Sequence, residues 1–351
     1  MILYALLYIV TVGINSVNKN IFNSRKIVMY IFNCDIKNLP KNTTLLGNTK
    51  KKIMAKLNNN LKHKNTLESI NISIELHISG YLDILLNKLI TYYFQNINLA
   101  QPRGVLYVYT FLNYYNKHYS KKDKKNIPLN IINDTVIRNF ICLFVTLLCG
   151  SNHRKLKLLM KFTDTEFNLK KKKKTLFSQN LNLVMKYINI NEDNNVVLAL
   201  SEIIILLNKK ELLDRESLII YWINWIFEYD KLYKNKNLKL INELDITGID
   251  TKHKYDYIWI LWKMIIDTSP THFVKVIKKL EWIYKYYFTK GNKRSKIYLL
   301  FTGLYLNINP SPKINNNINY IEDDLFTRMN IASLKSNTKY VSIYNKRIGN
   351  Y

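Results

Sequence analysis

Glycine and proline are scarce in this chain, and their scarcity limits the folds it can adopt. The 351 residues include only 9 glycines and 6 prolines. A β-sandwich or β-barrel needs a tight turn roughly every 8–12 residues, and such turns use glycine and proline heavily. Loops that bind dinucleotides or nucleotide phosphates also require glycines at fixed spacing. The composition therefore disfavours turn-rich all-β folds and enzymes of the dinucleotide-binding and P-loop classes.

The apolar residues from Thr66 onward recur at the spacing of amphipathic helices. Because 48% of the residues are hydrophobic, the chain has enough apolar side chains for a packed core. We therefore predict an all-α, multi-helix bundle of roughly nine to eleven helices, with basic loops and an irregular C-terminal tail. The clearest stripe, at i, i+3 and i+4 spacing, is Leu82, Leu85, Leu86, Leu89 and Ile90.

Several residues mark the expected helix ends. Gly80 is placed to end the helix that begins near Thr66. The Asn133–Asp134 pair and Asp214 can each cap the N-terminus of a following helix. Ser269 followed by Pro270 predicts a further start, with the serine as N-cap and the proline at the first helical position.

The chain divides by composition into four parts. We predict a basic N-terminal segment over residues 1–65, a helical domain over 66–165, a second helical unit over 176–306 and an irregular tail over 307–351. Met54 opens a stretch that reads like a domain start. One hypothesis is therefore that the residues before Met54 are an extension that is not native to the domain.

Positive charge is unevenly distributed along the sequence. Lys and Arg number 53 against 25 Asp and Glu, which gives a formal net charge of +28. Residues 1–66 and 121–175 each carry +10 and residues 252–351 carry +11, whereas 67–120 are neutral and 176–251 carry −3. Part of the lysine excess reflects an AT-rich coding style, but such a bias alone would spread the charge more evenly. Basic blocks can bind phosphate backbones without reading sequence. The alternative is that they are solvated loops.

Three clusters of basic residues are the candidate nucleic-acid-binding sites. Each combines several lysines within a short, polar stretch. The predicted partner is the nucleic-acid backbone, bound nonspecifically. The candidate residues are Lys121, Lys122, Lys124, Lys125, Lys170, Lys171, Lys172, Lys173, Lys174, Lys290, Lys293, Arg294 and Lys296.

The sequence contains no recognisable catalytic motif. P-loop, nucleophile-elbow, metalloprotease and protein-kinase signatures are all missing from it. Cys149 and His153 have an i, i+4 spacing that could ligate a metal, but no second Cys/His pair completes a four-ligand site. We therefore predict a protein that is not an enzyme and has no catalytic residues, no cofactor and no metal. The acidic run Glu322–Asp324 leaves a metal-dependent nuclease open as an alternative.

The number of cysteines and the apolar N-terminal residues indicate the compartment in which the protein is expected. Three cysteines are too few for a disulfide framework, so we expect an intracellular, reducing compartment. Cys142 and Cys149 lie seven residues apart in an apolar run, which predicts one face of a buried helix. The apolar stretch Met1–Gly13 is too short to span a bilayer, and we predict no membrane partner.

Two tryptophan pairs allow two interpretations. In each pair the residues are three positions apart and so lie on one helix face. Exposed, such a pair could stack on bases of single-stranded nucleic acid. Because both pairs lie in apolar stretches, packing in a helix–helix core is the favoured interpretation. The pairs are Trp222 with Trp225 and Trp259 with Trp262.

Residues 66–103 resemble a known family. The stretches Ile74–Tyr81, Leu86–Leu89 and Gln95–Pro102 are similar to the helical C-terminal region of the replication-associated recombination proteins, the family of RarA, MgsA and the Werner-helicase-interacting ATPase. There a helix ends in glycine, a second helix follows, and a motif E-D-I-G-x-A-x-P closes the unit. Its Ile, Ala and Pro are in register here, whereas Gln and Asn replace Glu and Asp, and Asn98 stands in place of Gly.

The resemblance implies a collar-like helical domain related to clamp loaders, used for oligomerisation and for contact with replication proteins. No ATPase module accompanies it in this sequence, so ATP hydrolysis is not implied. The functional hypothesis is a non-catalytic replication or repair accessory that binds nucleic acid or replication partners through basic segments. The Asn-rich style also resembles proteins of large DNA viruses, so a viral replication site or a virion is an expected location. The alternative is a virion-associated structural or scaffolding protein that binds the genome nonspecifically.

Overall fold

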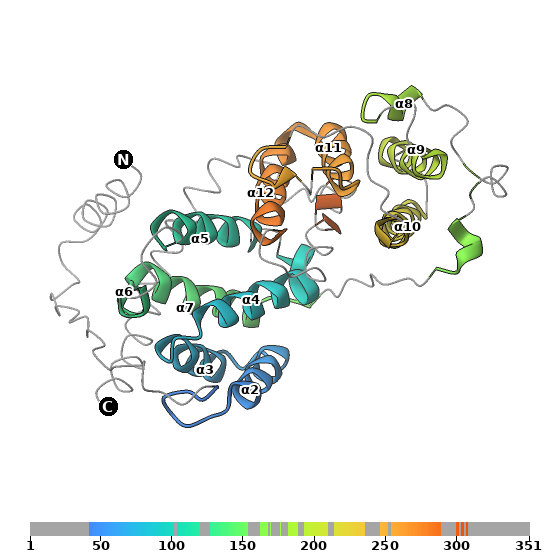
Figure 1. Cartoon of the computed structure of the whole chain (residues 1–351). Helices are drawn as coiled ribbons and strands as arrows, with labels where there is room; N and C mark the ends of the chain where they lie inside the picture. The colour runs from blue at the N-terminus through green and yellow to red at the C-terminus, as the bar shows by residue number, and fades with distance from the viewer. Residues whose placement is uncertain are drawn as a thin grey trace. The chain divides into compact units, whose positions relative to one another are not determined.

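The computed structural model describes residues 42–101, 104–119, 127–153, 162–167, 182–188, 193–209, 214–235, 246–251 and 254–288, with single positions at 169, 176, 300, 301, 303, 304 and 307. These residues form helices joined by turns, as Figure 1 shows, and the described ranges contain no β-strand. One isolated antiparallel bridge links Thr43 and Thr49. The all-α prediction is confirmed.

The chain forms two compact units, each built from separated segments. The described residues of unit 1 lie within 42–86 and 119–150, and those of unit 2 lie within 87–118 and 151–318. This division differs from the predicted linear domains 66–165 and 176–306. The reason is that helices distant in sequence pack together, which a reading along the chain does not detect.

Unit 1 is organised around helix α3. Helices α2 and α7 both pack against α3 and also meet each other, and α6 packs against α7 (Figure 1). Helix α3 is buried on more than one side, because Ile70, Ile74 and Leu76 lie on more than one face of the helix and are all fully buried. Helix α2 contributes a single apolar face from Ile53 and Leu57. The helices are α2 (Lys50–Lys62), α3 (Thr66–Ile78), the first part of α4 (Leu82–Tyr92), α6 (Ile127–Asn133) and α7 (Thr135–Gly150).

Two predicted helix ends of unit 1 are confirmed. Gly80 has φ of +79°, a conformation that glycine adopts without steric cost. Its amide donates to the His77 carbonyl at 3.0 Å, and the Tyr81 amide donates to the Leu76 carbonyl at 2.9 Å, which is the hydrogen-bond pattern of a Schellman C-cap. At the start of α7, the Asp134 carboxylate accepts the amide of Val136 at 2.7 Å.

The expected basic N-terminal segment is in part a packed element. Helix α2 begins at Lys50, so Met54 lies inside a helix. The preceding turn is anchored to α3 because the buried Glu75 carboxylate accepts from the Thr44 hydroxyl at 2.5 Å and from the Asn48 side-chain amide at 2.9 Å. The basic stretch at residues 120–130 has the composition of a loop, but helix α6 begins within it, at Ile127.

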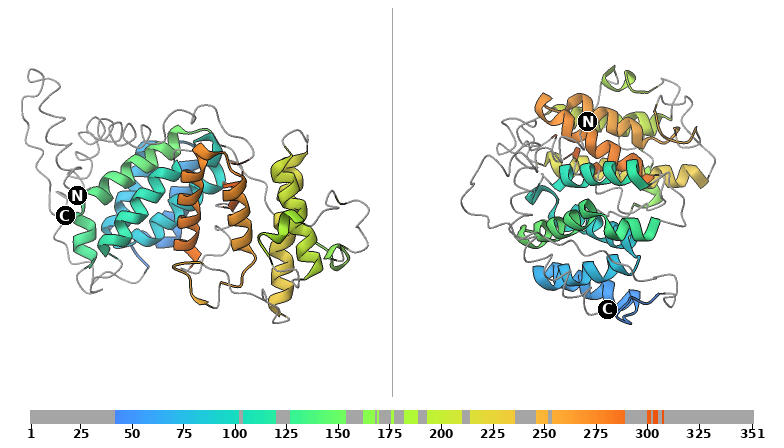
Figure 2. Two further views of the ribbon diagram at one scale, coloured as in Figure 1. Left: turned by 90° about the horizontal axis from the view of Figure 1, so that it is seen from above. Right: turned by 90° about the vertical axis from the view of Figure 1, so that its left-hand side faces the viewer.

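The helices of unit 2 pack mainly around α9 and α11. Helix α9 packs against α8, α10 and α11, and α11 packs against α12. Figure 2 shows α11 and α12, coloured orange, running side by side. The described helical elements are η2 (Tyr93–Ile97), η3 (Asn98–Ala100), α5 (Gly104–Tyr119), η4 (Asp164–Phe167), α8 (Asn182–Met185), α9 (Asn194–Asn208), α10 (Arg215–Asn235), α11 (Ile258–Thr268) and α12 (Thr271–Phe288).

Four of the five tryptophans form the core of unit 2. None of the four side chains is more than 6% exposed, so the core interpretation of the two pairs is confirmed. Trp225 stacks on Tyr229 at 4.5 Å between ring centroids, and Trp262 meets Tyr284 at 5.5 Å.

Of the helices that the structure describes, none combines the length and apolar character needed to cross a bilayer.

A buried arginine closes the C-terminal end of α9. Arg215, the first residue of α10, is 6% exposed and donates to the carbonyls of Leu206 and Leu207, each at 2.5 Å. The last carbonyls of a helix lack partners within the helix. The guanidinium supplies two donors to this pair, and burial lowers the pKa of Arg215.

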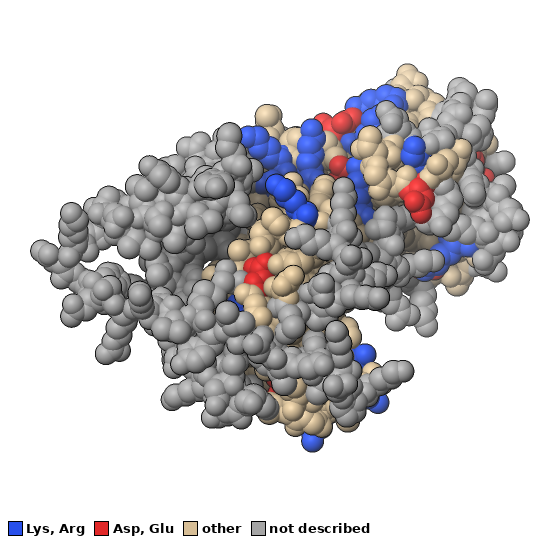
Figure 3. Space-filling view, turned by 60° about the vertical axis from the view of Figure 1, so that its left-hand side comes forward, with Lys and Arg blue, Asp and Glu red and all other residues tan. Residues whose placement is uncertain are grey.

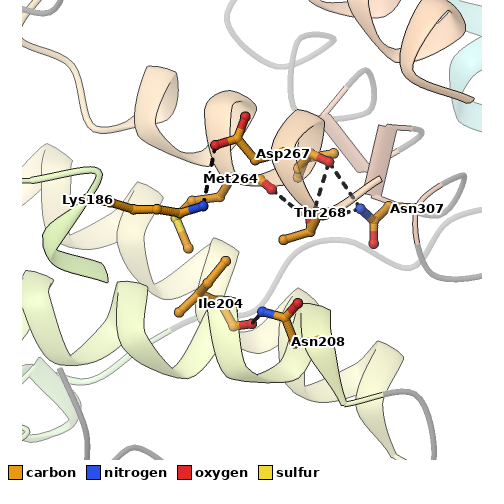
Figure 4. Close-up of polar contacts among 8 residues, drawn as sticks. Lys186, Ile204, Asn208, Met264, Asp267, Thr268 and Asn307 are labelled. Carbon is orange, nitrogen blue, oxygen red and sulfur yellow. Dashed lines mark hydrogen bonds and ion pairs between the residues drawn. The ribbon is translucent and has the colours of Figure 1, made fainter. Parts of the chain in front are cut away.

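The predicted cap at Ser269 is wrong. Helix α12 begins at Thr271, and Ser269 is instead the C-cap of α11, where its hydroxyl donates to the Ile265 carbonyl. Asn307, expected at the start of an irregular tail, is helical and buried, and it donates to the Thr268 and Ser269 hydroxyls, each at 2.9 Å (Figure 4). Ser269 therefore caps the C-terminus of α11 and not the N-terminus of α12. Tertiary contacts determine which of the two roles it takes.

The turn between α4 and α5 is strained. A π-helical turn, Tyr93–Ile97, leads into Asn98, which has φ of +43° and ψ of −112°. Such values suit glycine and cost a side chain of order 1–3 kcal/mol. Asn98 is fully buried, and its side-chain amide donates to the Phe94 carbonyl at 3.2 Å. Nearby, Gly104 lies so close to Tyr93 that an added Cβ would come within 2.2 Å of the ring.

Replacing Asn98 with glycine is expected to raise the free energy of unfolding by about 1 kcal/mol, because relief of the backbone outweighs one lost hydrogen bond. Asn98→Ala keeps the strain and loses the same bond, so it is expected to lower that free energy by about 1 kcal/mol. Urea denaturation of both variants measures the difference. Equal stability of the glycine and alanine variants would show that the turn carries no strain.

Candidate nucleic-acid interface

The predicted basic clusters lie outside the residues that the structure describes. This holds for Lys121–Lys125, Lys170–Lys174 and Lys290–Lys296, and also for the acidic run Glu322–Asp324. Those clusters therefore stay predictions. The described residues contain two other lysine-rich surfaces, one on α2 and one on α12.

The solvent face of α2 is basic. Ile53, Leu57 and Leu61 are buried at i, i+4 and i+8, whereas the lysines between them are exposed. Lys56 forms an exposed ion pair with Glu68 at 2.5 Å. The exposed lysines of α2 and the turn after it are Lys51, Lys52, Lys56, Lys62 and Lys64.

The surface of α12 combines lysines with aromatic rings. Five residues of this helix follow one another at i, i+3, i+4, i+7 and i+11, a spacing that keeps them within about a third of the helix circumference. All five are at least partly exposed. We call this set the lysine–aromatic stripe; it consists of Lys275, Lys278, Lys279, Trp282 and Tyr286.

The opposite face of α12 holds the stripe in place. Phe273, Ile277, Leu280 and Ile283 are fully buried. Their burial fixes the rotation of the helix, because turning it would expose them at a cost of roughly 1.5–3 kcal/mol for each side chain. The stripe is therefore presented on a rigid element rather than on a loop.

The aromatic rings of the stripe are organised by contacts with one another and with α5. Trp282 and Tyr286 are nearly parallel, with ring centroids 5.6 Å apart and an interplanar angle of 18°. Tyr109 of α5 meets Trp282 edge-on at 5.1 Å. Lys279 places its ammonium 5.2 Å from the centre of the Tyr109 ring, a cation–π contact. Two helices of unit 2 thus join three rings and a lysine in one cluster.

Electrostatic repulsion within the stripe favours an anionic ligand. Partial burial lowers the pKa of Lys279, and the neighbouring charge of Lys275 lowers it further. The nearest acidic residue in sequence, Glu281, is paired with Lys285 at 3.0 Å. In Figure 3, several Lys and Arg side chains lie close together on the upper described surface, with acidic side chains between some of them. A phosphate beside Lys275 and Lys279 would offset their mutual repulsion.

The stripe contains no run of more than two consecutive lysines and no tryptophan pair, and these are the two patterns most easily recognised in the sequence. Trp282 is the one tryptophan outside the two pairs. The pattern Lys-x-x-Lys-Lys-x-x-Trp-x-x-x-Tyr, read at the helical period, would have found the stripe.

Cys149 and His153 have separate surroundings. The Cys149 thiol is buried and lies 3.8 Å from the Ser69 hydroxyl. The His153 imidazole lies 3.1 Å from the Tyr92 hydroxyl. Burial raises the pKa of Cys149. It also raises the pKa of Cys142, to about 12. Both cysteines are buried, as predicted. Within the described ranges, no three His, Cys, Asp or Glu side chains cluster in a way that could hold a metal ion.

In comparisons with known proteins, no family model, no curated protein and no solved structure matches this chain.

Proposed function

We propose that this protein is a non-catalytic accessory of DNA replication or repair that binds nucleic-acid backbones nonspecifically. The lysine–aromatic stripe is the observation that carries the proposal, because it gathers lysines on one solvent face of a rigid helix. Neutralising phosphates releases counterions, so such a surface binds without base-specific contacts. The exposed lysines of α2 and the net charge of +28 support the same conclusion.

The turn at Asn98 supports the collar-like part of the proposal. In the recombination-protein family that residues 66–103 resemble, the corresponding position is glycine. In this structure Asn98 has a positive φ, the conformation that glycine adopts most easily. The backbone geometry at Asn98 therefore agrees with the family's glycine at one of the three motif positions where the two sequences differ. We propose contact with replication proteins or self-association as the role of this helical unit.

DNA affinity is expected to fall steeply between low and moderate salt, because counterion release sets a slope of about −0.9 for each phosphate neutralised on duplex DNA. Replacing Lys275, Lys278 and Lys279 with glutamine is expected to make the slope shallower by about 2–3, close to one for each lysine that no longer meets a phosphate. Fluorescence anisotropy at several salt concentrations measures the slope.

The matched control replaces the same number of exposed lysines elsewhere in unit 2, with the changes Lys186→Gln, Lys231→Gln and Lys263→Gln. An equal loss in the control would show that total charge, and not the stripe, sets the affinity. Binding that does not depend on salt would contradict the proposed function. Charge reversal across Lys170–Lys174 tests that predicted segment in the same assay, and unchanged binding would remove it from the proposal.

A further inference from the structure

The fifth tryptophan differs from the other four in its surroundings. The side chains of Trp222, Trp225, Trp259 and Trp262 are almost fully buried, whereas Trp282 stays partly exposed between lysines. Tryptophan carries the largest apolar surface of any side chain, so leaving it partly in water gives up stability that burial would supply. A partly exposed indole on a basic helix face is therefore better explained by binding than by core packing.

The rings of the stripe form a surface on which a flat group can stack. Trp282 and Tyr286 are one helical turn apart, and their rings are nearly parallel. The edge-on contact with Tyr109 fixes the orientation of the indole, so ordering it on binding costs little entropy. Parallel rings on one face match the bases of a nucleic-acid strand, every one of which has a π-face.

The lysines lie beside the rings on the same face. Lys278 and Lys279 come one turn before Trp282, and Lys275 comes two turns before it. A strand whose bases stack on the rings can run its phosphates along these ammonium groups. This combination of a positive surface and aromatic platforms is typical of proteins that bind single strands without sequence preference.

We propose that the lysine–aromatic stripe, together with Tyr109 of α5, binds single-stranded nucleic acid by stacking bases on Trp282 and Tyr286 while its lysines contact the phosphates. The proposal rests on the proposed function and specifies its substrate. Single strands are favoured over duplexes because paired bases stack on each other and present only their edges in the grooves.

The test compares a thymidine oligomer of about 20 nucleotides with a duplex of the same length, at one salt concentration, by fluorescence anisotropy. The unaltered protein is expected to bind the single strand more tightly. Trp282→Ala is expected to weaken single-strand binding about tenfold, while duplex affinity and the salt slope stay unchanged. Trp282→Phe keeps a ring and is expected to retain most of the affinity. Phe227→Ala, a partly exposed aromatic on α10, is the matched control and is expected to change neither.

Tryptophan emission provides an independent readout that does not need an alanine variant to fold. The thymidine oligomer is expected to quench the emission of the unaltered protein, because a base stacks on the indole, and this quenching is expected to disappear in Trp282→Phe. Quenching that persists in Trp282→Phe would overturn the stacking proposal. Salt-dependent binding with equal affinity for both nucleic acids would also overturn it while leaving the proposed function intact. Failure to bind either nucleic acid would contradict both.

Discussion

Acidification from pH 7 to about 4 is expected to lower the free energy of unfolding by about 3 kcal/mol through His77 alone. His77 is fully buried in α3, and its Nε2 lies 3.3 Å from the Ile131 carbonyl. Burial, followed by the nearby charge of Arg138, lowers the pKa of His77 to about 3, against the opposing effects of the Ile131 hydrogen bond and Asp134. The folded protein therefore holds this imidazole neutral at pH values where the unfolded chain protonates it.

The sign and range of the effect follow from the two pKa values. Above about pH 6.5 neither state binds the proton, so the stability is at its full value. Below that pH the unfolded chain takes up a proton that the folded protein excludes, and stability falls by about 1.4 kcal/mol for each pH unit. The decline is expected to end near pH 3, where the folded protein also binds the proton.

Urea denaturation at pH 7 and pH 4 measures this contribution. Other groups add their own pH dependence, so the informative quantity is the difference between the protein and its His77→Gln variant. On acidification, the free energy of unfolding of the His77→Gln variant is expected to fall by about 3 kcal/mol less than that of the unaltered protein, whatever the stability of the variant at pH 7. His63→Gln, at an exposed position in the turn after α2, is the control and is expected to behave like the unaltered protein. A His77 imidazole that titrates near pH 6.5 by NMR would contradict the prediction.

Replacing Arg215 with alanine is expected to lower the free energy of unfolding by about 3–5 kcal/mol. The substitution removes two charge-assisted hydrogen bonds and leaves the carbonyls of Leu206 and Leu207 without these donors in a buried environment. It also leaves a cavity where the side chain packs between α9 and α10. Lysine keeps the charge but lacks the planar fork of donors, so Arg215→Lys is expected to recover only part of the loss.

Thermal and urea denaturation compare these variants with Lys209→Ala, which truncates an exposed basic side chain at the same end of α9. The control is expected to stay within about 0.5 kcal/mol of the unaltered protein. If Arg215→Ala is as stable as that control, the guanidinium does not stabilise the helix end.

The features of the fold that could be predicted from sequence are those set by local chemistry. Gly80 ends α3 because only glycine adopts its φ cheaply, and Asp134 begins α7 because a short carboxylate reaches the first amides of a helix. Both effects act over a few residues and leave a readable signature. Buried pairs of tryptophans were also predictable, since the residues around them are apolar.

Features set by distant residues could not be predicted in this way. Ser269 precedes a proline, yet its hydroxyl serves α11, because the buried Asn307 approaches it from 38 residues away. Arg215 follows Asp214 in a polar stretch and looks like an exposed charge, but the packing of α9 against α10 buries it. The stripe was missed for a related reason: lysines spaced by three and four positions gather on one helix face although no more than two of them are consecutive in the sequence.

The interleaving of the two units along the chain constrains the order in which they fold during synthesis. The residues of unit 1 up to Leu86 emerge from the ribosome first, but α7, which contacts α2 and α3, does not emerge until residue 150 has been added. In the interval the segment 87–118 is made ahead of the remainder of unit 2. The nascent protein therefore holds two incomplete cores at once, with apolar faces of α3 and α5 that their own later helices have yet to cover. A chaperone that binds exposed apolar helices can act on both units during this stage of translation.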